Sequence, residues 1–171
     1  YKINISSRTL HFLLPAGTSR GVYTTRKSYY VTLSDSNQPD VVGIGECATL
    51  PDLSCDAMSD EEYELKLRSF CDNFCHTGVI DIAAMRPYPS MLFGLETAKA
   101  QLDAKGSINL FNTSFGRGEE GITINGLVWM GSFDEMFQRL EAKLTAGFRC
   151  VKLKIGAIDF KKEIELIRHI R

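Results

Sequence analysis

An excess of charge of one sign and long apolar runs are both lacking in this chain, and each lack argues against a class of protein. Lysine and arginine total 20, aspartate and glutamate total 21, and the net charge is -1, so no basic patch predicts nucleic-acid binding. No apolar run predicts a membrane span, and the first residues resemble a strand rather than a secretory leader. With 44% hydrophobic and 24% charged residues, the sequence predicts an ordinary folded protein without repeats.

Paired cysteines are also lacking. The five cysteines are odd in number and irregularly spaced, which favours a reducing compartment over a disulfide framework, and we expect the cytoplasm. Cys71, Cys75 and His76, with Cys55 as a fourth ligand, offer the alternative of a zinc site. Structural zinc sites usually match one close cysteine pair with a second, and that second pair is missing. We expect Cys71 and Cys75, four residues apart on a helix, to be small apolar residues against a core, and we expect no metal ligand in the chain.

Residues 1–120 have the pattern of an α+β domain. Strand-like segments cover residues 2–14, 22–33 and 41–44, and the turn-rich residues 34–40 join the last two, as in an antiparallel meander. Two helices are predicted after the strands. The capping box from Ser59 to Glu62 opens the first, which ends near residue 73, and Ser90 caps the second over residues 91–104.

Residues 121–171 alternate between strand and helix patterns. We predict a strand over residues 122–128, a helix from the capping box at Ser132 to Gly147, a strand over residues 150–155 and a last amphipathic helix. This order is typical of parallel βα units covered by helices, and we expect the first part of a TIM-type barrel. A closed barrel takes about 250 residues. We therefore expect this sequence to be the N-terminal part of a longer protein.

Two lysines in the predicted strand over residues 150–155 are the most informative feature. Lys152 and Lys154 alternate with three aliphatic residues, so the two ammonium groups share one face, about 7 Å apart. A solvated or edge-strand face is the ordinary interpretation of such a pattern. At the mouth of a barrel, however, the same pair would be usable as proton acceptors, because burial favours the neutral amine.

Several segments carry a family resemblance. Three of them are Gly43-Ile44-Gly45-Glu46-Cys47, Phe93-Gly94-Leu95-Glu96-Thr97-Ala98 and Val151-Lys152-Leu153-Lys154-Ile155-Gly156. They and the α+β domain resemble the enolase superfamily, in the branch of muconate-lactonising enzymes, dipeptide epimerases and o-succinylbenzoate synthases. Two further stretches are most similar to the synthases: Pro15-Ala16-Gly17-Thr18-Ser19-Arg20-Gly21 and Ile124-Asn125-Gly126-Leu127-Val128-Trp129-Met130-Gly131. The resemblance implies an α+β capping domain over residues 1–120 and a barrel from residue 121.

The resemblance also implies roles for single residues. It makes Lys154 the general base and Lys152 the neighbour whose charge favours the neutral form of that base. It implies Mg2+ as a cofactor, held by two aspartates and a glutamate on later barrel strands, beyond residue 171, where a further lysine also belongs. Ser19 and Arg20 lie in a loop that would fold over the barrel mouth, with Arg20 pairing with a substrate carboxylate. Their ordinary interpretation is a surface hairpin loop.

Trp129 follows the first predicted barrel strand, where residues either face an active site or pack under a cap. Taken together, the resemblance implies a carbon-oxygen lyase, an o-succinylbenzoate synthase of menaquinone biosynthesis. Such an enzyme removes a proton alpha to a carboxylate and then releases water. A dipeptide epimerase or N-acylamino acid racemase would use the same lysines, and a non-catalytic binding protein on this fold is a third alternative. We expect a small-molecule carboxylate as partner, with no nucleic acid and no membrane; the oligomeric state is not predicted.

Overall fold

The computed structural model describes residues 1–18, 21–50, 53–156 and 158–170, and its chain forms two compact units. Unit 1 consists of Tyr1–Leu13 and Thr24–Glu119, and unit 2 of Leu14–Tyr23 and Glu120–Arg171. An α+β unit followed by the first βα elements confirms the fold class expected from the sequence. The assignment of residues 1–120 and 121–171 to two domains stays a prediction, since Leu14–Tyr23 groups with the later residues.

A three-stranded sheet has the order β1-β2-β3, formed by Lys2–Thr18, Gly21–Asp35 and Gln38–Ala48, and its residues up to Leu13 and from Thr24 belong to unit 1. β2 and β3 are antiparallel, with Ser28 opposite Ala48 and Ser34 opposite Val42. All three strands are longer than their sequence patterns indicated. The hydrogen-bonded partner extends each strand past the residues whose own side chains favour it, because a strand is stabilised by its neighbour.

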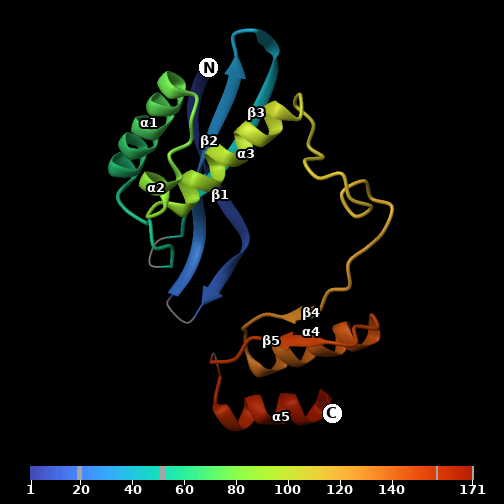
Figure 1. Ribbon diagram of the computed structural model, residues 1–171. Helices are drawn as coiled ribbons and strands as arrows, with labels where there is room; N and C mark the ends of the chain where they lie inside the picture. Colours follow the sequence, from blue (N-terminus) through green and yellow to red (C-terminus); the bar gives the residue numbers. More distant parts are fainter. Residues whose placement is uncertain (19–20, 51–52, 157, 171) are drawn as a thin grey trace. The chain divides into compact units, whose positions relative to one another are not determined.

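Three helices accompany this sheet: α1 over Asp60–Thr77, α2 over Ile82–Met85 and α3 over Pro89–Asp103 (Figure 1). The capping box at the start of α1 is confirmed, since the Ser59 side chain accepts from the Glu62 amide and the Glu62 side chain accepts from Ser59. The helix runs four residues past its predicted end. It stops at Gly78, whose φ of 70° is the left-handed conformation that glycine adopts without strain.

The prediction that Ser90 caps α3 is wrong. The helix begins at Pro89, whose ring fixes φ in the helical range, and Tyr88 is the N-cap without a side-chain capping bond. Ser90 instead donates from its amide and hydroxyl to a carboxylate oxygen of the buried Asp56, at 2.8 and 2.5 Å. The Tyr63 hydroxyl lies 2.6 Å from the Ser90 hydroxyl. These contacts tie the segment between β3 and α1 to the start of α3.

Helix α3 packs directly on β3 because glycines replace side chains at their contact. A Cβ at Gly45 would collide with the Gly94 carbonyl oxygen, and one at Gly43 with the Ala98 carbonyl oxygen. Backbones can approach this closely only where no side chain intervenes. The core around this contact comprises Tyr29, Val31, Leu33, Cys47, Tyr63, Leu67, Cys71, Phe74, Met85, Met91, Leu95, Ala98 and Leu102.

Unit 2 contains a two-stranded parallel sheet and two helices. β4 is Gly126–Val128, α4 is Phe133–Thr145, β5 is Val151–Leu153 and α5 is Phe160–Ile170. The parallel arrangement predicted from the strand and helix order is confirmed, with Leu127 opposite Lys152. Both strands are shorter than predicted, because only three residues of each strand pair with the other. Val128, Met136, Leu140 and Leu166 are fully buried and form the core.

The strict alternation expected along residues 150–155 holds only in part. Val151 and Leu153 are half-buried and pack against the core of unit 2, while Lys152 is exposed. Ile155 was expected to share the buried face, but it lies beyond the end of β5 and is 56% exposed. The chain leaves the sheet geometry at this point, so the period of two no longer applies.

None of the helices in the described ranges has the length and apolar character needed to cross a membrane.

Candidate active site at the ends of β4 and β5

Lys154 stands one residue past the end of β5 with a well-fixed backbone. Its amide donates to the carbonyl oxygen of Val128 at 3.0 Å, which continues the bonding between β4 and β5. Two residues later, the Gly156 amide donates at 2.5 Å to the Glu163 carboxylate, which is buried on α5. The segment that carries Lys154 is therefore anchored on both sides, to β4 and to α5.

The structure brings Lys154 together with Trp129, another residue that the sequence assigned to the site. The Lys154 ammonium nitrogen lies 5.4 Å from the centroid of the Trp129 ring. This distance is within the range of a cation-π contact, which contributes about 0.5–1 kcal/mol at an exposed position. Trp129 is 36% exposed and Lys154 is half-buried, so both side chains stay accessible from one side.

Lys152 lies on the face of the sheet that points away from the core of unit 2. Its register partner Leu127 is 40% exposed, whereas the next residue of β4, Val128, is fully buried. Trp129 and Lys154 each stand one residue past the end of these strands, where alternation no longer fixes the side. The register therefore puts Lys152 on the open face, while Lys154 and the indole are brought together by their own contact beyond the strand ends.

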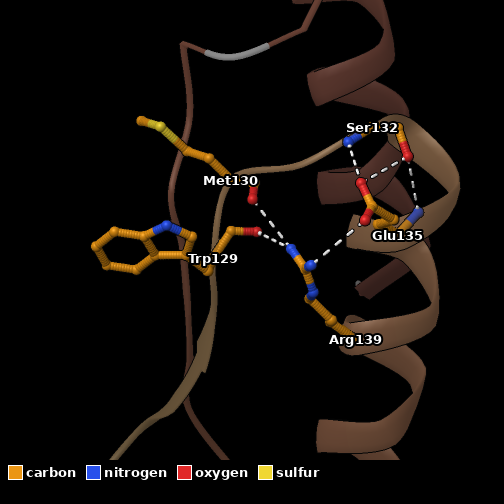
Figure 2. A network of polar contacts seen from close by, with 5 residues as sticks. All are labelled: Trp129, Met130, Ser132, Glu135 and Arg139. Carbon is orange, nitrogen blue, oxygen red and sulfur yellow. Dashed lines mark hydrogen bonds and ion pairs between the residues drawn. The ribbon is translucent and has the colours of Figure 1, made fainter. Parts of the chain in front are cut away.

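The turn between β4 and α4 is held by a polar network (Figure 2). Ser132 and Glu135 form the predicted capping box, with the Ser132 amide 2.8 Å from Glu135 Oε2. These bonds from Ser132, and the charge of Arg139, lower the pKa of Glu135 below its usual value. Arg139 also donates to the carbonyl oxygens of Trp129 and Met130, at 3.1 and 3.0 Å. Sequence reasoning found the capping box but missed Arg139, although its spacing of four from Glu135 was a usable signal.

A groove of about 400 Å³ lies beside this turn, within unit 2. It is lined by Gly17, Thr18, Met130, Gly131, Ser132 and Ile158. The end of β1 therefore contributes to the same neighbourhood as the turn after β4. Ser19 and Arg20, which were expected to contact substrate, lie outside the described residues, immediately after Thr18.

Metal ligands do not gather anywhere in the described part of the chain, where no three His, Cys, Asp or Glu side chains are close enough to hold an ion. The zinc alternative at Cys55, Cys71, Cys75 and His76 is thus not supported by the described residues. Burial also raises the pKa of the Cys71 thiol to about 12, which disfavours the thiolate that zinc requires. The described residues likewise do not fit the Mg2+ that the family resemblance implies.

Comparison with known proteins connects this geometry to a family, although no family model matches the chain. The o-succinylbenzoate synthase of Desulfotalea psychrophila is 36% identical over 95% of this chain and 51% of its own length. The crystal structure of MenC from the same organism has a TM-score of 0.64 at 29% identity, covering 99% of this chain and 52% of that one. The chain thus spans about half the length of the curated relative that it matches.

Two more distant structures share the fold. An enolase family member from Agrobacterium tumefaciens with homology to dipeptide epimerases has a TM-score of 0.69 at 17% identity, over 98% of this chain and 49% of that one. The o-succinylbenzoate synthase of Thermosynechococcus elongatus, with magnesium in its active site, has a TM-score of 0.68 at 18% identity, over 99% and 48%. The 36% identical relative is matched over 95% of this chain, and its name falls in the family that the sequence resembles. The chain belongs to the enolase superfamily.

Proposed function

We propose that the protein carrying this chain is an o-succinylbenzoate synthase, a carbon-oxygen lyase of menaquinone biosynthesis. The observation that carries the proposal is the 36% identity to a curated o-succinylbenzoate synthase over 95% of the chain. The substrate would be a small carboxylate with a hydroxyl group on a cyclohexadiene ring. Loss of one proton and of the hydroxyl group turns that ring aromatic, which makes the reaction strongly favourable.

Lys154 is the proposed general base. Its neutral amine takes the proton alpha to the carboxylate, and the electron pair of the broken C–H bond moves into the carboxylate as an enediolate. When the electron pair returns, the hydroxyl group leaves with its bonding electrons and takes the proton that Lys154 removed, so that water is released, the Lys154 amine is neutral again and the ring becomes aromatic. The anchored backbone supports this role, because a base must be held at a fixed distance from the reacting carbon.

The other site residues enter the proposal with more limited roles. Lys152, on the open face of the β4–β5 sheet, supplies a second positive charge near the substrate carboxylate. Trp129 provides an apolar surface against the ring, and Ser19 and Arg20 would contact the substrate from the loop after Thr18. Magnesium belongs to the proposal as cofactor because the Thermosynechococcus elongatus enzyme holds it in its active site, and its ligands are not among the described residues. We also propose a cytoplasmic location, in keeping with five free thiols.

The test replaces Lys154 in the full-length protein and follows ring aromatisation by ultraviolet absorbance with magnesium present. Lys154→Ala should reduce turnover by a factor of about 10² to 10⁴, the usual contribution of a general base. Lys154→Arg should fail similarly, because the guanidinium group stays protonated and accepts no proton. Lys161→Ala, an exposed lysine on α5, is the matched control and should leave the rate unchanged. Near-normal turnover in Lys154→Ala would contradict the proposal.

A second measurement separates the proposal from its alternatives. The wild-type protein is incubated in deuterated water with an Ala-Glu dipeptide and, separately, with an N-acylamino acid. Deuterium uptake at the alpha carbon without any aromatisation activity would identify an epimerase or racemase that uses the same lysines. If the protein supports neither reaction but still binds a carboxylate, the non-catalytic alternative replaces the synthase.

A further inference from the structure

We propose that Arg139 is a positioning residue that fixes the turn after β4, so that the indole of Trp129 stays against the ammonium group of Lys154. The inference concerns the geometry of unit 2. Only its activity readout rests on the proposed function. Arg139 contacts neither Lys154 nor the open face of the sheet through any described bond, so its effect passes through the backbone of Trp129 and Met130.

The turn needs such a residue because the sheet stops providing partners there. The carbonyl oxygen of Val128 still accepts the amide of Lys154 from the neighbouring strand. The next two carbonyl oxygens, those of Trp129 and Met130, accept from one nitrogen of Arg139 instead. Arg139 on α4 thus hydrogen-bonds the two carbonyl oxygens that follow β4, where the pairing with β5 ends. Among the described residues, no other hydrogen bond holds the carbonyl oxygens of Trp129 and Met130.

The guanidinium group is itself fixed from the other side. Its second nitrogen lies 3.6 Å from a Glu135 oxygen, and Glu135 is held by the amide and hydroxyl of Ser132. Gly131 completes the enclosure, since a Cβ there would lie 2.8 Å from Arg139 Nη1 and 2.9 Å from Glu135 Oε2. A planar fork with several donors can satisfy all these partners together, which a lysine ammonium cannot do with the same geometry.

Figure 2 shows the guanidinium group and the indole on opposite sides of the turn, so that Arg139 acts from behind the residue that faces Lys154. A surface ion pair of this exposure contributes little to stability. The ion pair of Arg68 with Glu64 on α1 has the same spacing of four residues and a similar exposure, but Arg68 donates to no backbone carbonyl of a described residue. Substitution of Arg68 is therefore a matched control, because it breaks a surface ion pair without removing a contact to the backbone.

The experiment reads the Trp129 environment directly in the full-length protein labelled with 5-fluorotryptophan. Fluorine NMR assigns the Trp129 resonance as the one that disappears in Trp129→Phe. We expect Lys154→Met to shift this resonance in the wild-type background. Arg139→Met should shift and broaden it and should remove most of its response to Lys154→Met. Arg68→Met should change neither property.

Arg139→Lys separates geometry from charge. It keeps a cation beside Glu135 but loses the double contact with the two carbonyls, and it should disturb the Trp129 resonance as Arg139→Met does. It also serves as the second variant if Arg139→Met does not fold. An unchanged Trp129 resonance in both variants, or complete rescue by lysine, would overturn the inference.

The activity readout follows from the same displacement. In an active synthase, Arg139→Met should lower kcat by about 10-fold, within the range that a small misplacement of a catalytic group causes, with little change in KM. A moved resonance in a protein without synthase activity would support the positioning role and refute the proposed function. An unmoved resonance in an active synthase would refute the positioning role and support the proposed function.

Discussion

The two units differ most in the size of their buried hydrophobic cores. Among the described residues, thirteen buried hydrophobic side chains form the core of unit 1 and four form that of unit 2. Unit 1 also buries polar groups, since Asp56, Ser90 and Tyr63 form a continuous set of hydrogen bonds inside it. In unit 2 the hydrogen bonds of the β4–α4 turn are at or near the surface.

The larger core and the candidate site residues therefore belong to different units. A sheet of three long strands with helices packed on it provides unit 1 with a core of its own. Two parallel strands of three residues each are a marginal sheet, and one face of that sheet remains open. Lys154, Trp129 and Arg139 all belong to unit 2. The side chains with candidate chemistry thus lie in the less buried unit, as is common for functional segments.

The largest expected effect tests the closest contact of unit 1. Gly45→Ala places a methyl group against the Gly94 carbonyl oxygen, and backbone cannot move aside as a flexible side chain can. We expect the free energy of unfolding, measured with urea, to fall by about 3 kcal/mol or more. Gly121→Ala, where a Cβ would meet nothing within 4 Å, should change it by less than about 0.5 kcal/mol. Equal effects of the two substitutions would contradict the close approach of α3 and β3.

A paired cavity experiment compares the two cores directly. Leu67 in unit 1 and Leu140 in unit 2 are both fully buried on helices. Leu67→Ala should cost about 3 kcal/mol, and Leu140→Ala about 2 kcal/mol, because a smaller core can collapse around the lost atoms more completely. Hydrogen exchange should show faster exchange of α1 in the first variant and of α4 in the second. Loss of protection across both helices in either variant would show that the two units unfold together.

The smallest effect at neutral pH concerns the buried thiols of unit 1. Burial raises the pKa of Cys47 and of Cys71 to about 12. In the unfolded chain these thiols lose their protons at lower pH than in the folded one, so unfolding is favoured as pH rises from about 9 towards 12. The stabilisation is fully present below that window. The urea midpoint of unit 1 should therefore stay constant up to about pH 9 and fall between about pH 9 and pH 12.

Replacing these thiols provides the control for the alkaline effect. Cys47→Ala should flatten the dependence of the midpoint on pH, whereas Cys150→Ala, which removes an exposed thiol from unit 2, should not. A thiol reagent should modify Cys55 and Cys150 in the folded protein before it reaches Cys47. Rapid modification of Cys47 without unfolding would mean that the core of unit 1 opens more easily than its burial indicates.

Local signals in the sequence predicted the features that local physics controls. The capping boxes at Ser59 and Ser132 formed as expected, because their partners are three residues apart and need no tertiary contact. Ser90 shows the limit of the same reasoning. Its hydroxyl had a distant and buried partner in Asp56, which no local pattern reveals, and Pro89 was enough to start the helix.

In the candidate site, too, the sequence identified single residues but not the contacts between them. Lys154 and Trp129 were identified separately, one from strand periodicity and the other from its place after a strand, and both rested on the resemblance to the enolase superfamily. Their contact at 5.4 Å required the parallel pairing of β4 with β5. The role of Arg139 was not predicted, because its partners are main-chain oxygens that any residue type can supply.

The sequence by itself determined the order of strands and helices, the starts of α1 and α4, and the family to which the chain belongs. These depend on side-chain periodicity, on short-range hydrogen bonds and on the identity of residues. Only the tertiary structure decided where each strand ends, that α3 lies on β3 through glycines, and that Arg139 and Lys154 both contact Trp129. Those features depend on which backbones come close in space, and a linear pattern does not record the partner that a carbonyl oxygen or a missing side chain will meet.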